Sequence, residues 1–185
     1  DVSMLDCQIA ILENAIARYL SKNEIPGPMG SRHPSIAPFE AFKTKDSYII
    51  IAAGNDKLFT KLCEVLKIPE TANDERFNSN SLRCENMDHL KEIFEKQLSS
   101  KSTDEWVKEM EELKIPCGPI FNIKQAVENP QIQERNMIVK SYHKIIGEFK
   151  SAGNPIKMST YKDENTRGDI PDLDEHREKI IKEFS

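Results

Sequence analysis

The first third of the chain passes from an amphipathic helical pattern through a proline-rich break into two apolar strands. Apolar side chains recur at helical spacing through residues 1–20 and predict one helix there. Residues 24–35 contain three prolines and two glycines, which predict a loop. Residues 36–44 and 48–53 then predict a β-hairpin, and the unbroken apolar run of its second strand predicts burial on both faces.

The remaining pattern predicts helices and a second pair of strands. Asn55 or Asp56 can cap a helix, another is expected near residues 80–99, and Ser102 with Glu105 forms a capping box that begins a third. The later predicted elements are an extended segment over 115–122, two helical turns split by Pro130, strands over 137–143 and 145–150, a polar connector over 151–171 and a final helix. This order of elements predicts an α+β fold.

Composition and charge narrow the classes of partner. Charged residues make up 31% of the 185 residues and the net charge is −5. Acidic and basic residues are interspersed, so no basic stripe is available for phosphates, and a nucleic-acid partner is not expected. No apolar stretch approaches the roughly 20 residues that cross a bilayer, so no membrane partner is expected either.

The cysteines indicate the compartment and argue against a metal centre. They stand at positions 7, 63, 84 and 117, without a Cys-x-x-Cys pair and without a histidine at ligand spacing. A zinc site is therefore not expected. Free thiols in a reducing, cytoplasmic setting fit this spacing better than a disulfide framework does.

Two segments could contribute to a site, although neither forms a complete one. His33 lies in the predicted loop, where functional residues concentrate. Gly54 and Asn55 directly follow the apolar strand and allow two interpretations. They can be a strand end and helix cap, with Gly54 present because the turn needs a permissive backbone. Alternatively, they can line a ligand pocket at the edge of the sheet. The sequence contains no Gly-x-Ser-x-Gly elbow and no phosphate-binding glycine loop.

The order of several short motifs is more specific than any one of them. These are GSRHPSIAPFEAFKTKDSYIIIAAGND, then DERF with Arg83 shortly after, then IPCGPI, NPQIQERNMI and finally PDLDEH. In this order they resemble the class III CoA-transferase family, also called CaiB–BaiF. The chain is most similar to members that act on dicarboxylic acids, such as succinyl-CoA:glutarate CoA-transferases. The resemblance covers nearly the whole chain.

This resemblance implies a domain organisation. Members of the family are interlocked homodimers, with a large domain built from both chain ends and a small α+β domain inserted between them. Residues 1–24 would be the last helix of the first portion of the large domain, and 25–32 a linker loop. Residues 33–125 would be the small domain, and 126–185 the return toward the large domain.

The resemblance also implies the chemistry. The family moves coenzyme A between carboxylic acids through an aspartyl-CoA thioester, and its nucleophilic aspartate would lie upstream of Asp1. A coenzyme A thioester and a carboxylic acid would be the substrates, with no tightly bound cofactor and no metal. The substrate-lining candidates in this chain are Gly27, Gly30, Ser31, His33, Gly54 and Asn55.

Two alternatives remain open. The related CoA-ester racemases carry an acidic residue about where Asn55 stands. An amide cannot abstract a proton, so Asn55 favours a transferase over a racemase. A free-standing, non-catalytic module would instead use the broad apolar face of residues 1–20 for oligomerisation.

Overall fold

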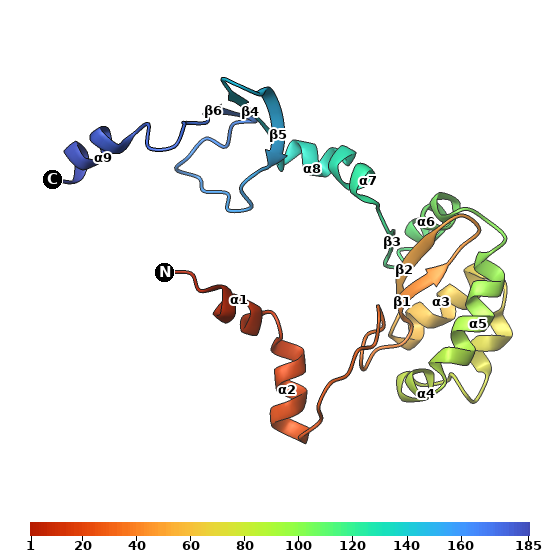
Figure 1. The fold of residues 1–185 in the computed structure, drawn as a ribbon. Coiled ribbons are helices and arrows are strands. Elements are labelled where there is room, and N and C mark those ends of the chain that lie inside the picture. The colour runs from red at the N-terminus through yellow and green to blue at the C-terminus, as the bar shows by residue number, and fades with distance from the viewer. The chain divides into compact units, whose positions relative to one another are not determined.

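The predicted hairpin forms two strands of a three-stranded sheet. Strands β1 (Phe39–Lys43) and β2 (Tyr48–Ala52) pair antiparallel, and β3 (Cys117–Pro119) pairs antiparallel with the other edge of β2, in the order β1-β2-β3. The computed structural model describes residues 1–185, which divide into two units, 1–120 and 121–185. The sheet belongs to the first unit (Figure 1). The predicted domain limits at 24, 32 and 125 stay predictions.

Side-chain caps begin three of the helices that follow the hairpin. After the hairpin the chain forms α3 (Asp56–Val65), the 3₁₀ helix η1 (Pro69–Asn73), α4 (Asn80–Glu85), α5 (Met87–Leu98) and α6 (Thr103–Glu112). The caps are Asn55 for α3, Ser79 for α4 and Ser102 for α6. The predicted capping box of Ser102 and Glu105 is present at the start of α6. In the hairpin turn, the Asp46 carboxylate accepts hydrogen bonds from the backbone nitrogen (2.9 Å) and hydroxyl (3.0 Å) of Thr103. These bonds hold the pKa of Asp46 below its ordinary value, and they tie the turn to α6.

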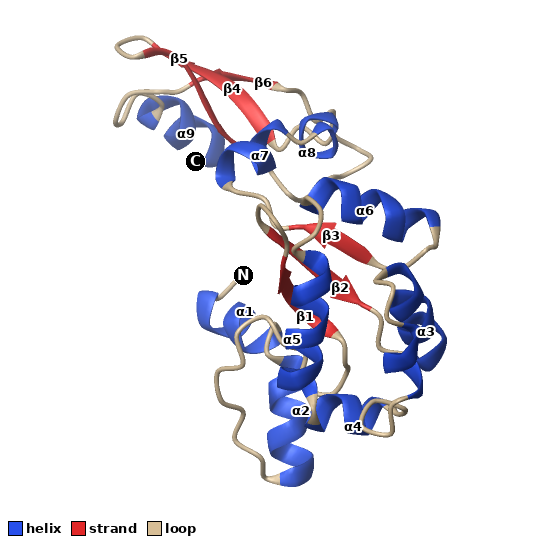
Figure 2. Ribbon diagram, turned by 90° about the vertical axis from the view of Figure 1, so that its right-hand side faces the viewer, coloured by secondary structure: helices blue, strands red, loops and turns tan.

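One face of the sheet carries the core. Phe42 pairs with Ile49 across the two strands, and both side chains are fully buried. Helices α3, α5 and α6 pack beside the sheet (Figure 2) and bury their apolar faces in the same core. The helical members of the core are Phe59, Leu62, Cys63, Met87, Leu90, Phe94, Leu98, Trp106 and Met110. Burial of these side chains is the main contribution to the stability of the unit.

Two sequence predictions about this unit are wrong in part. Strand β2 is not buried on both faces: Ile49 and Ile51 are buried, whereas Tyr48 is exposed and Ile50 is half-buried. The helices contact only one face, so burial alternates along the strand. The single helix predicted near 80–99 is interrupted at Asn86, whose amide nitrogen donates to Leu82 O (2.9 Å) and so competes with continued helical pairing.

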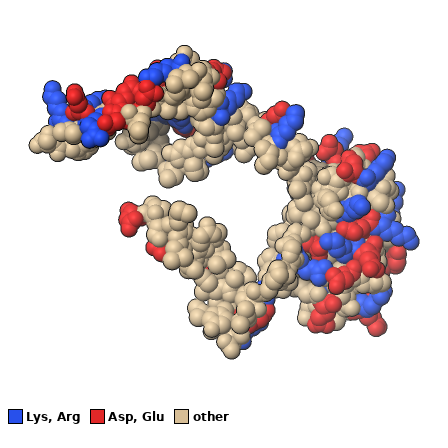
Figure 3. All heavy atoms as spheres, viewed as in Figure 1, with Lys and Arg blue, Asp and Glu red and all other residues tan.

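The predicted helix over residues 1–20 is two helices. Helix α1 (Met4–Ala10) and helix α2 (Glu13–Lys22) are separated at Ile11 and Leu12, and neither buries a side chain. No packing within the chain selects one continuous helix over two short ones. The large exposed apolar side chains of this segment are Val2, Met4, Leu5, Ile9, Ile11, Leu12, Tyr19 and Leu20. Figure 3 shows mostly uncharged atoms on this segment, whereas charges of both signs cover the folded part of the first unit.

The second unit contains the other sheet. Strands β4 (Ile138–His143) and β5 (Gly147–Ala152) pair antiparallel, as the alternating pattern predicts. A third strand, β6 (Thr166–Asp169), pairs parallel with β4. Its polar sequence gives no strand signal, so the predicted connector over 151–171 missed it. The helices of this unit are α7 (Ile123–Glu128), α8 (Pro130–Glu134) and α9 (Arg177–Phe184). None of the helices in the structure is both long and apolar enough to cross a membrane.

Candidate functional site

An apolar pocket of about 420 Å³ opens where β2 ends and α3 begins. Phe39 and Ala52 are cross-strand partners and lie on the sheet face opposite Phe42 and Ile49, because side chains alternate along a strand. The complete lining, which we call the apolar pocket, is Ile36, Phe39, Ala52, Gly54, Asn55, Leu58 and Asn80. Its side chains carry no formal charge, so it suits the hydrocarbon part of a small ligand.

Gly54 is required by packing and not by backbone conformation. A Cβ atom built on Gly54 would lie 2.0 Å from Cγ2 of Ile36, and its φ is not in the left-handed region. The sequence-based reason for this glycine, a permissive backbone in the turn, is therefore wrong. Ile36 packs directly over the Gly54 backbone, and this contact shapes one wall of the apolar pocket.

Asn55 is both a helix cap and a lining residue. Its side-chain oxygen accepts a hydrogen bond from Leu58 N at 2.9 Å, so the predicted cap of α3 is confirmed. The structure records no hydrogen bond from its amide nitrogen. Asn80, by contrast, uses both ends of its side chain: it accepts from Ala37 N (3.0 Å) and donates to Ser35 O (2.8 Å). Of the two asparagines that line the pocket, Asn55 is therefore the one whose amide NH₂ can donate to a ligand.

Arg83 holds the segment around Gly54 in place. This side chain is fully buried and donates to three backbone carbonyl oxygens, those of Ala37 (2.8 Å), Phe77 (3.0 Å) and Gly54 (3.1 Å). It also donates to the Asp56 carboxylate at 2.8 Å. The guanidinium thus links α4 to the strand end and to the first turn of α3, as a planar fork of five donors can. Sequence reasoning noted Arg83 only as part of a motif.

The predicted loop forms a second, polar pocket of about 460 Å³. Its lining, which we call the loop pocket, is Pro28, Met29, Gly30, Ser31, Arg32, Glu40 and Lys91. Gly30 has a φ of +64°, a left-handed conformation that favours glycine. His33 lies between the two pockets in sequence, and its ring stacks on Phe39 with centroids 5.2 Å apart. Its Nδ1 accepts a hydrogen bond from Ser35 N (3.2 Å).

The six sequence candidates are distributed over these pockets. Gly54 and Asn55 line the apolar pocket, Gly30 and Ser31 line the loop pocket, and His33 contacts Phe39 of the apolar pocket. Gly27 lines neither pocket. Sequence reasoning missed the other lining residues of both pockets, among them Ile36, Asn80 and Glu40. Asn80 carried the one usable signal, because it stands close after the DERF motif.

Other reactive side chains do not add a nucleophile here. Burial raises the pKa of the Cys63 thiol to about 12, and burial also raises the pKa of Cys84 and Cys117. A thiol that is protonated at neutral pH is a poor nucleophile. No group of three or more histidine, cysteine or acidic side chains gathers in a way that could hold a metal ion. The two pockets can bind and orient a ligand.

Comparison with known proteins identifies the family. The sequence profile described as CoA-transferase family III matches residues 1–177. The chain is 38% identical over its full length to acetyl-CoA:oxalate CoA-transferase of Acetobacter aceti, and covers 46% of that protein. It is 32% identical to human succinyl-CoA:glutarate CoA-transferase over 99% of its length, and covers 42% of that protein. The chain thus spans less than half the length of these relatives.

Solved structures agree with the sequence match. A CAIB/BAIF family protein from Brucella suis superposes with a TM-score of 0.75 and 32% identity, over 97% of this chain and 46% of the other. The α+β architecture predicted from the order of helices and strands is confirmed. The chain belongs to CoA-transferase family III.

Proposed function

We propose that this chain is part of an enzyme that moves coenzyme A between carboxylic acids, with a dicarboxylic acid as one substrate. The observation that carries the proposal is the family match over residues 1–177. The names of two relatives support the substrate class, since both oxalate and glutarate are dicarboxylates. A CoA thioester is the other substrate, and the reaction needs no metal and no tightly bound cofactor.

The proposed mechanism is covalent catalysis by an aspartate outside these 185 residues. The aspartate carboxylate attacks the carbonyl carbon of the acyl-CoA thioester. The carbon–sulfur bond breaks, and CoA leaves as a thiolate while a mixed anhydride forms. The thiolate attacks the aspartyl carbonyl, which releases the first acid and leaves an aspartyl-CoA thioester. The second acid repeats these steps in reverse and leaves as its CoA thioester, with the aspartate regenerated.

The role of this chain would be to line and orient. The apolar pocket can hold the hydrocarbon part of the acyl group, because its side chains are uncharged. Backbone amides of the loop with Gly27, Gly30 and Ser31 can stabilise developing oxyanions, together with His33. Asn55 offers its free amide nitrogen to a polar atom of the acyl group. The uncharged Asn55 also supports transfer over racemisation.

The proposed assembly is an interlocked homodimer in a cytoplasmic setting. In this arrangement residues 1–24 and 126–185 belong to the large domain, and residues 33–125 form the small one. The exposed apolar side chains of α1 support a partner for this segment, because large exposed apolar patches are uncommon on monomers.

The first prediction is that transfer needs the polypeptide upstream of Asp1. We expect the protein expressed with that upstream sequence to form a new CoA thioester from succinyl-CoA and glutarate or from acetyl-CoA and oxalate. The 185-residue chain alone should form none, because it lacks the nucleophile. Thioester exchange followed by liquid chromatography and mass spectrometry measures both. Robust turnover by the 185-residue chain, abolished by mutating a residue within it, would contradict the proposal, as would no transfer by the longer protein with any acid pair.

The second prediction separates the two roles of Asn55 in the longer protein. Loss of the cap in Asn55→Ala should cost about 0.5–2 kcal/mol of stability. If Asn55 also lines the acyl site, turnover should fall further than in the matched variant Asn122→Ala. Asn122 caps α7 with a bond of the same length, 2.9 Å to Gln125 N. Asn55→Asp should keep the cap but raise KM for dicarboxylates, because it places a negative charge beside an anionic acyl group.

Melting curves and steady-state kinetics, measured on the same preparations, distinguish the capping role of Asn55 from a role in lining the acyl site. Asn55 is a cap alone if both Asn55 variants keep wild-type kinetics once folded. Asn122→Ala should lose stability by a similar amount and keep the kinetics of the wild type.

A further inference from the structure

Strand β1 is the outer strand of its sheet, and the glycine-bearing loop is bound along its free edge. We define this loop as residues 27–33. His33 N donates to Phe39 O at 2.9 Å, and Ala41 N donates to Ser31 Oγ at 3.1 Å. The His33 ring stacks on Phe39 with an interplanar angle of 7°. The loop therefore occupies backbone groups that an edge strand otherwise leaves open.

The face of β1 that points to the core carries an unexpected carboxylate. Glu40 follows Phe39 in the strand, so it lies on the same face as Phe42, and only 3% of its surface is exposed. A buried carboxylate is unfavourable unless cations pair with it. Arg32 Nε donates to Glu40 Oε1 at 2.9 Å, and Lys91 Nζ donates to Glu40 Oε2. Glu40 thus joins a loop residue and a residue of α5.

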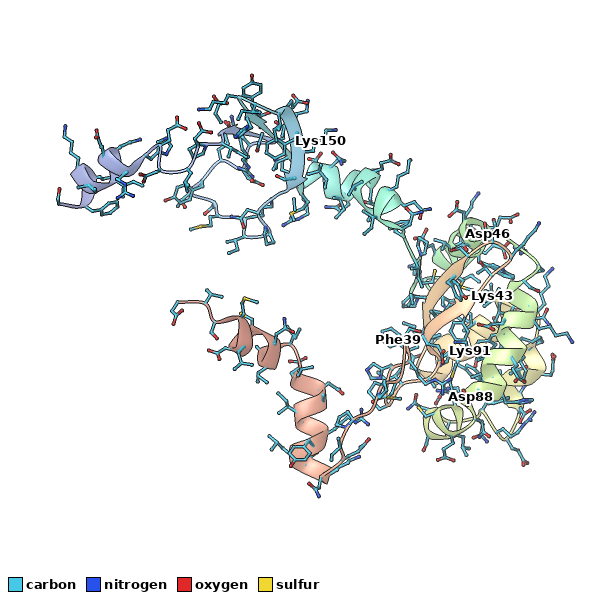
Figure 4. The ribbon with its side chains drawn as sticks, viewed as in Figure 1. Phe39, Lys43, Asp46, Asp88, Lys91 and Lys150 are labelled. Carbon is cyan, nitrogen blue, oxygen red and sulfur yellow. The ribbon has the colours of Figure 1, made fainter.

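Arg32 and Lys91 extend this contact to the rest of the unit. Arg32 Nη2 donates to Asp88 Oδ1 at 2.6 Å, and Lys91 Nζ also donates to Ala41 O at 3.0 Å. Figure 4 shows Asp88 and Lys91 along α5, beside the strand that carries Phe39. The four charged residues, which we call the loop anchor, are Arg32, Glu40, Asp88 and Lys91. They comprise two cations and two anions, so the cluster is formally neutral.

Within the loop anchor, Glu40 is the one residue of β1, and it connects the strand to both the loop and α5. Both cations share its carboxylate, and it is the one member that is nearly fully buried; the side chains of Arg32 and Lys91 are 28% and 31% exposed. A glutamine at this position has the same size, but it carries no charge, and its amide NH₂ would face one of the two cationic donors. Arg32 would then lose its ion pair with the strand, which is the only ion pair between the loop and β1.

We propose that Glu40 is a positioning residue: it fixes the loop 27–33 on β1 and so sets where the loop amides and His33 lie beside the transferring group. The proposal rests on the proposed function, because the group to be covered is the acyl group of the CoA-transfer reaction. A loop held in this way would exclude water from the activated acyl group as well as orient it. Release of the loop should therefore slow transfer and favour hydrolysis.

The experiment compares Glu40→Gln with the wild type in the longer protein. We expect kcat for CoA transfer to fall about 10- to 100-fold, the effect of a small misplacement of groups around a reacting centre. KM for the CoA thioester should change much less. The ratio of thioester hydrolysis to transfer should rise, because water reaches the acyl group. Hydrogen exchange measured by mass spectrometry should show backbone amides of residues 30–35 exchanging about 10-fold faster or more, with the core helices unchanged.

Two controls separate positioning from stability. Glu109→Gln makes the same chemical change in the more exposed Lys101–Glu109 pair of α6 and should leave kinetics and loop exchange unchanged. Thr103→Val breaks the buried hydroxyl contact of Thr103 with Thr44 (2.7 Å), at the hairpin turn and outside the contacts of the loop. It should lower stability without raising the hydrolysis ratio. If Glu40→Gln does not fold, Arg32→Gln removes the same ion pair from the loop side and should give the same kinetic and exchange changes.

The outcomes are distinct. If the wild-type protein transfers no CoA, both the proposed function and the kinetic role of Glu40 are wrong. Hydrogen exchange of the loop amides then still tests whether Glu40 holds the loop on β1. An active wild type whose Glu40→Gln and Arg32→Gln variants keep both the hydrolysis ratio and the loop exchange of the wild type overturns the inference alone. A Glu40→Gln variant that behaves like Thr103→Val, with lower stability and an unchanged ratio, also overturns it.

Discussion

Replacement of Arg83 by alanine is expected to destabilise the first unit by about 3–5 kcal/mol, because several buried acceptors lose their only strong donor at once. The three carbonyl oxygens that it binds belong to Ala37, Phe77 and Gly54. Each acceptor left without a partner costs about 1–3 kcal/mol, and the side chain also leaves a cavity. Water that enters the cavity can recover part of this loss.

The loss is large against the total stability of a domain, which is typically about 5–15 kcal/mol. Trp106 is the only tryptophan of the chain and is 2% exposed in the core of this unit, so its fluorescence reports the unfolding of this unit. Denaturant titration followed by Trp106 emission measures the effect. Arg83→Lys should be intermediate, because an ammonium keeps the charge but lacks the planar fork of donors.

Arg76→Ala is the matched control for Arg83→Ala. The Arg76 side chain is 52% exposed and forms its ion pair with Asp74 at the surface. Exposed pairs contribute little to stability, so the denaturation midpoint should hardly move. Equal midpoints for Arg83→Ala and Arg76→Ala would show that Arg83 does not hold the segment around Gly54.

The second large effect is expected in the other unit, at Gly153. A Cβ atom there would lie 2.1 Å from Asn136 O and 3.1 Å from Met137 Cα, both of which are backbone atoms. Gly153 N also donates to Met137 O at 2.9 Å, so the backbone cannot move aside without loss of this bond. Gly153→Ala should therefore cost about 1–3 kcal/mol, the usual range for overpacking.

Hydrogen exchange of β4 and β5 peptides measures this loss, because the unit contains no tryptophan. The expected loss corresponds to roughly 5- to 150-fold faster exchange, if these amides exchange through opening of the sheet. Gly168→Ala in β6 is the control, since a Cβ atom there meets nothing within 4 Å. The prediction fails if the two variants exchange alike.

Much of the local structure follows from the sequence because short-range interactions determine it. The cap of α3 at Asn55, the capping box at Ser102 and the split at Pro130 each depend on residues that are close neighbours in the chain. The order of motifs also led to the family, since it preserves spacing over nearly the whole chain. The helix caps could therefore be predicted without any information on contacts between distant residues.

The candidate site was only partly predictable. The sequence located the loop with Gly30, Ser31 and His33 and the strand end with Gly54 and Asn55. The residue pattern itself gave no reason to connect them, and it was the family resemblance that grouped them as substrate-lining candidates. In the structure β1 lies between them: the loop binds its free edge, and Phe39 lines the apolar pocket together with the strand end. The register of the hairpin places Ala52 opposite Phe39. Register depends on pairing between two strands, so the pattern of one strand alone does not determine it.

What the sequence by itself determined is therefore the α+β class, the hairpin, the caps and the family. Tertiary structure alone decided that β2 is buried on one face and that position 54 needs a glycine because Ile36 packs against it. It also decided that Arg83 and Glu40 are buried charges with partners. The physical reason is the range of the interactions. Caps and periodicity act within about four residues, whereas Arg83 reaches Ala37 across 46 positions and Lys91 reaches Glu40 across 51. Such pairs become neighbours only when α4 and α5 have packed against the sheet and the segments that flank it, and no local pattern in the chain predicts them.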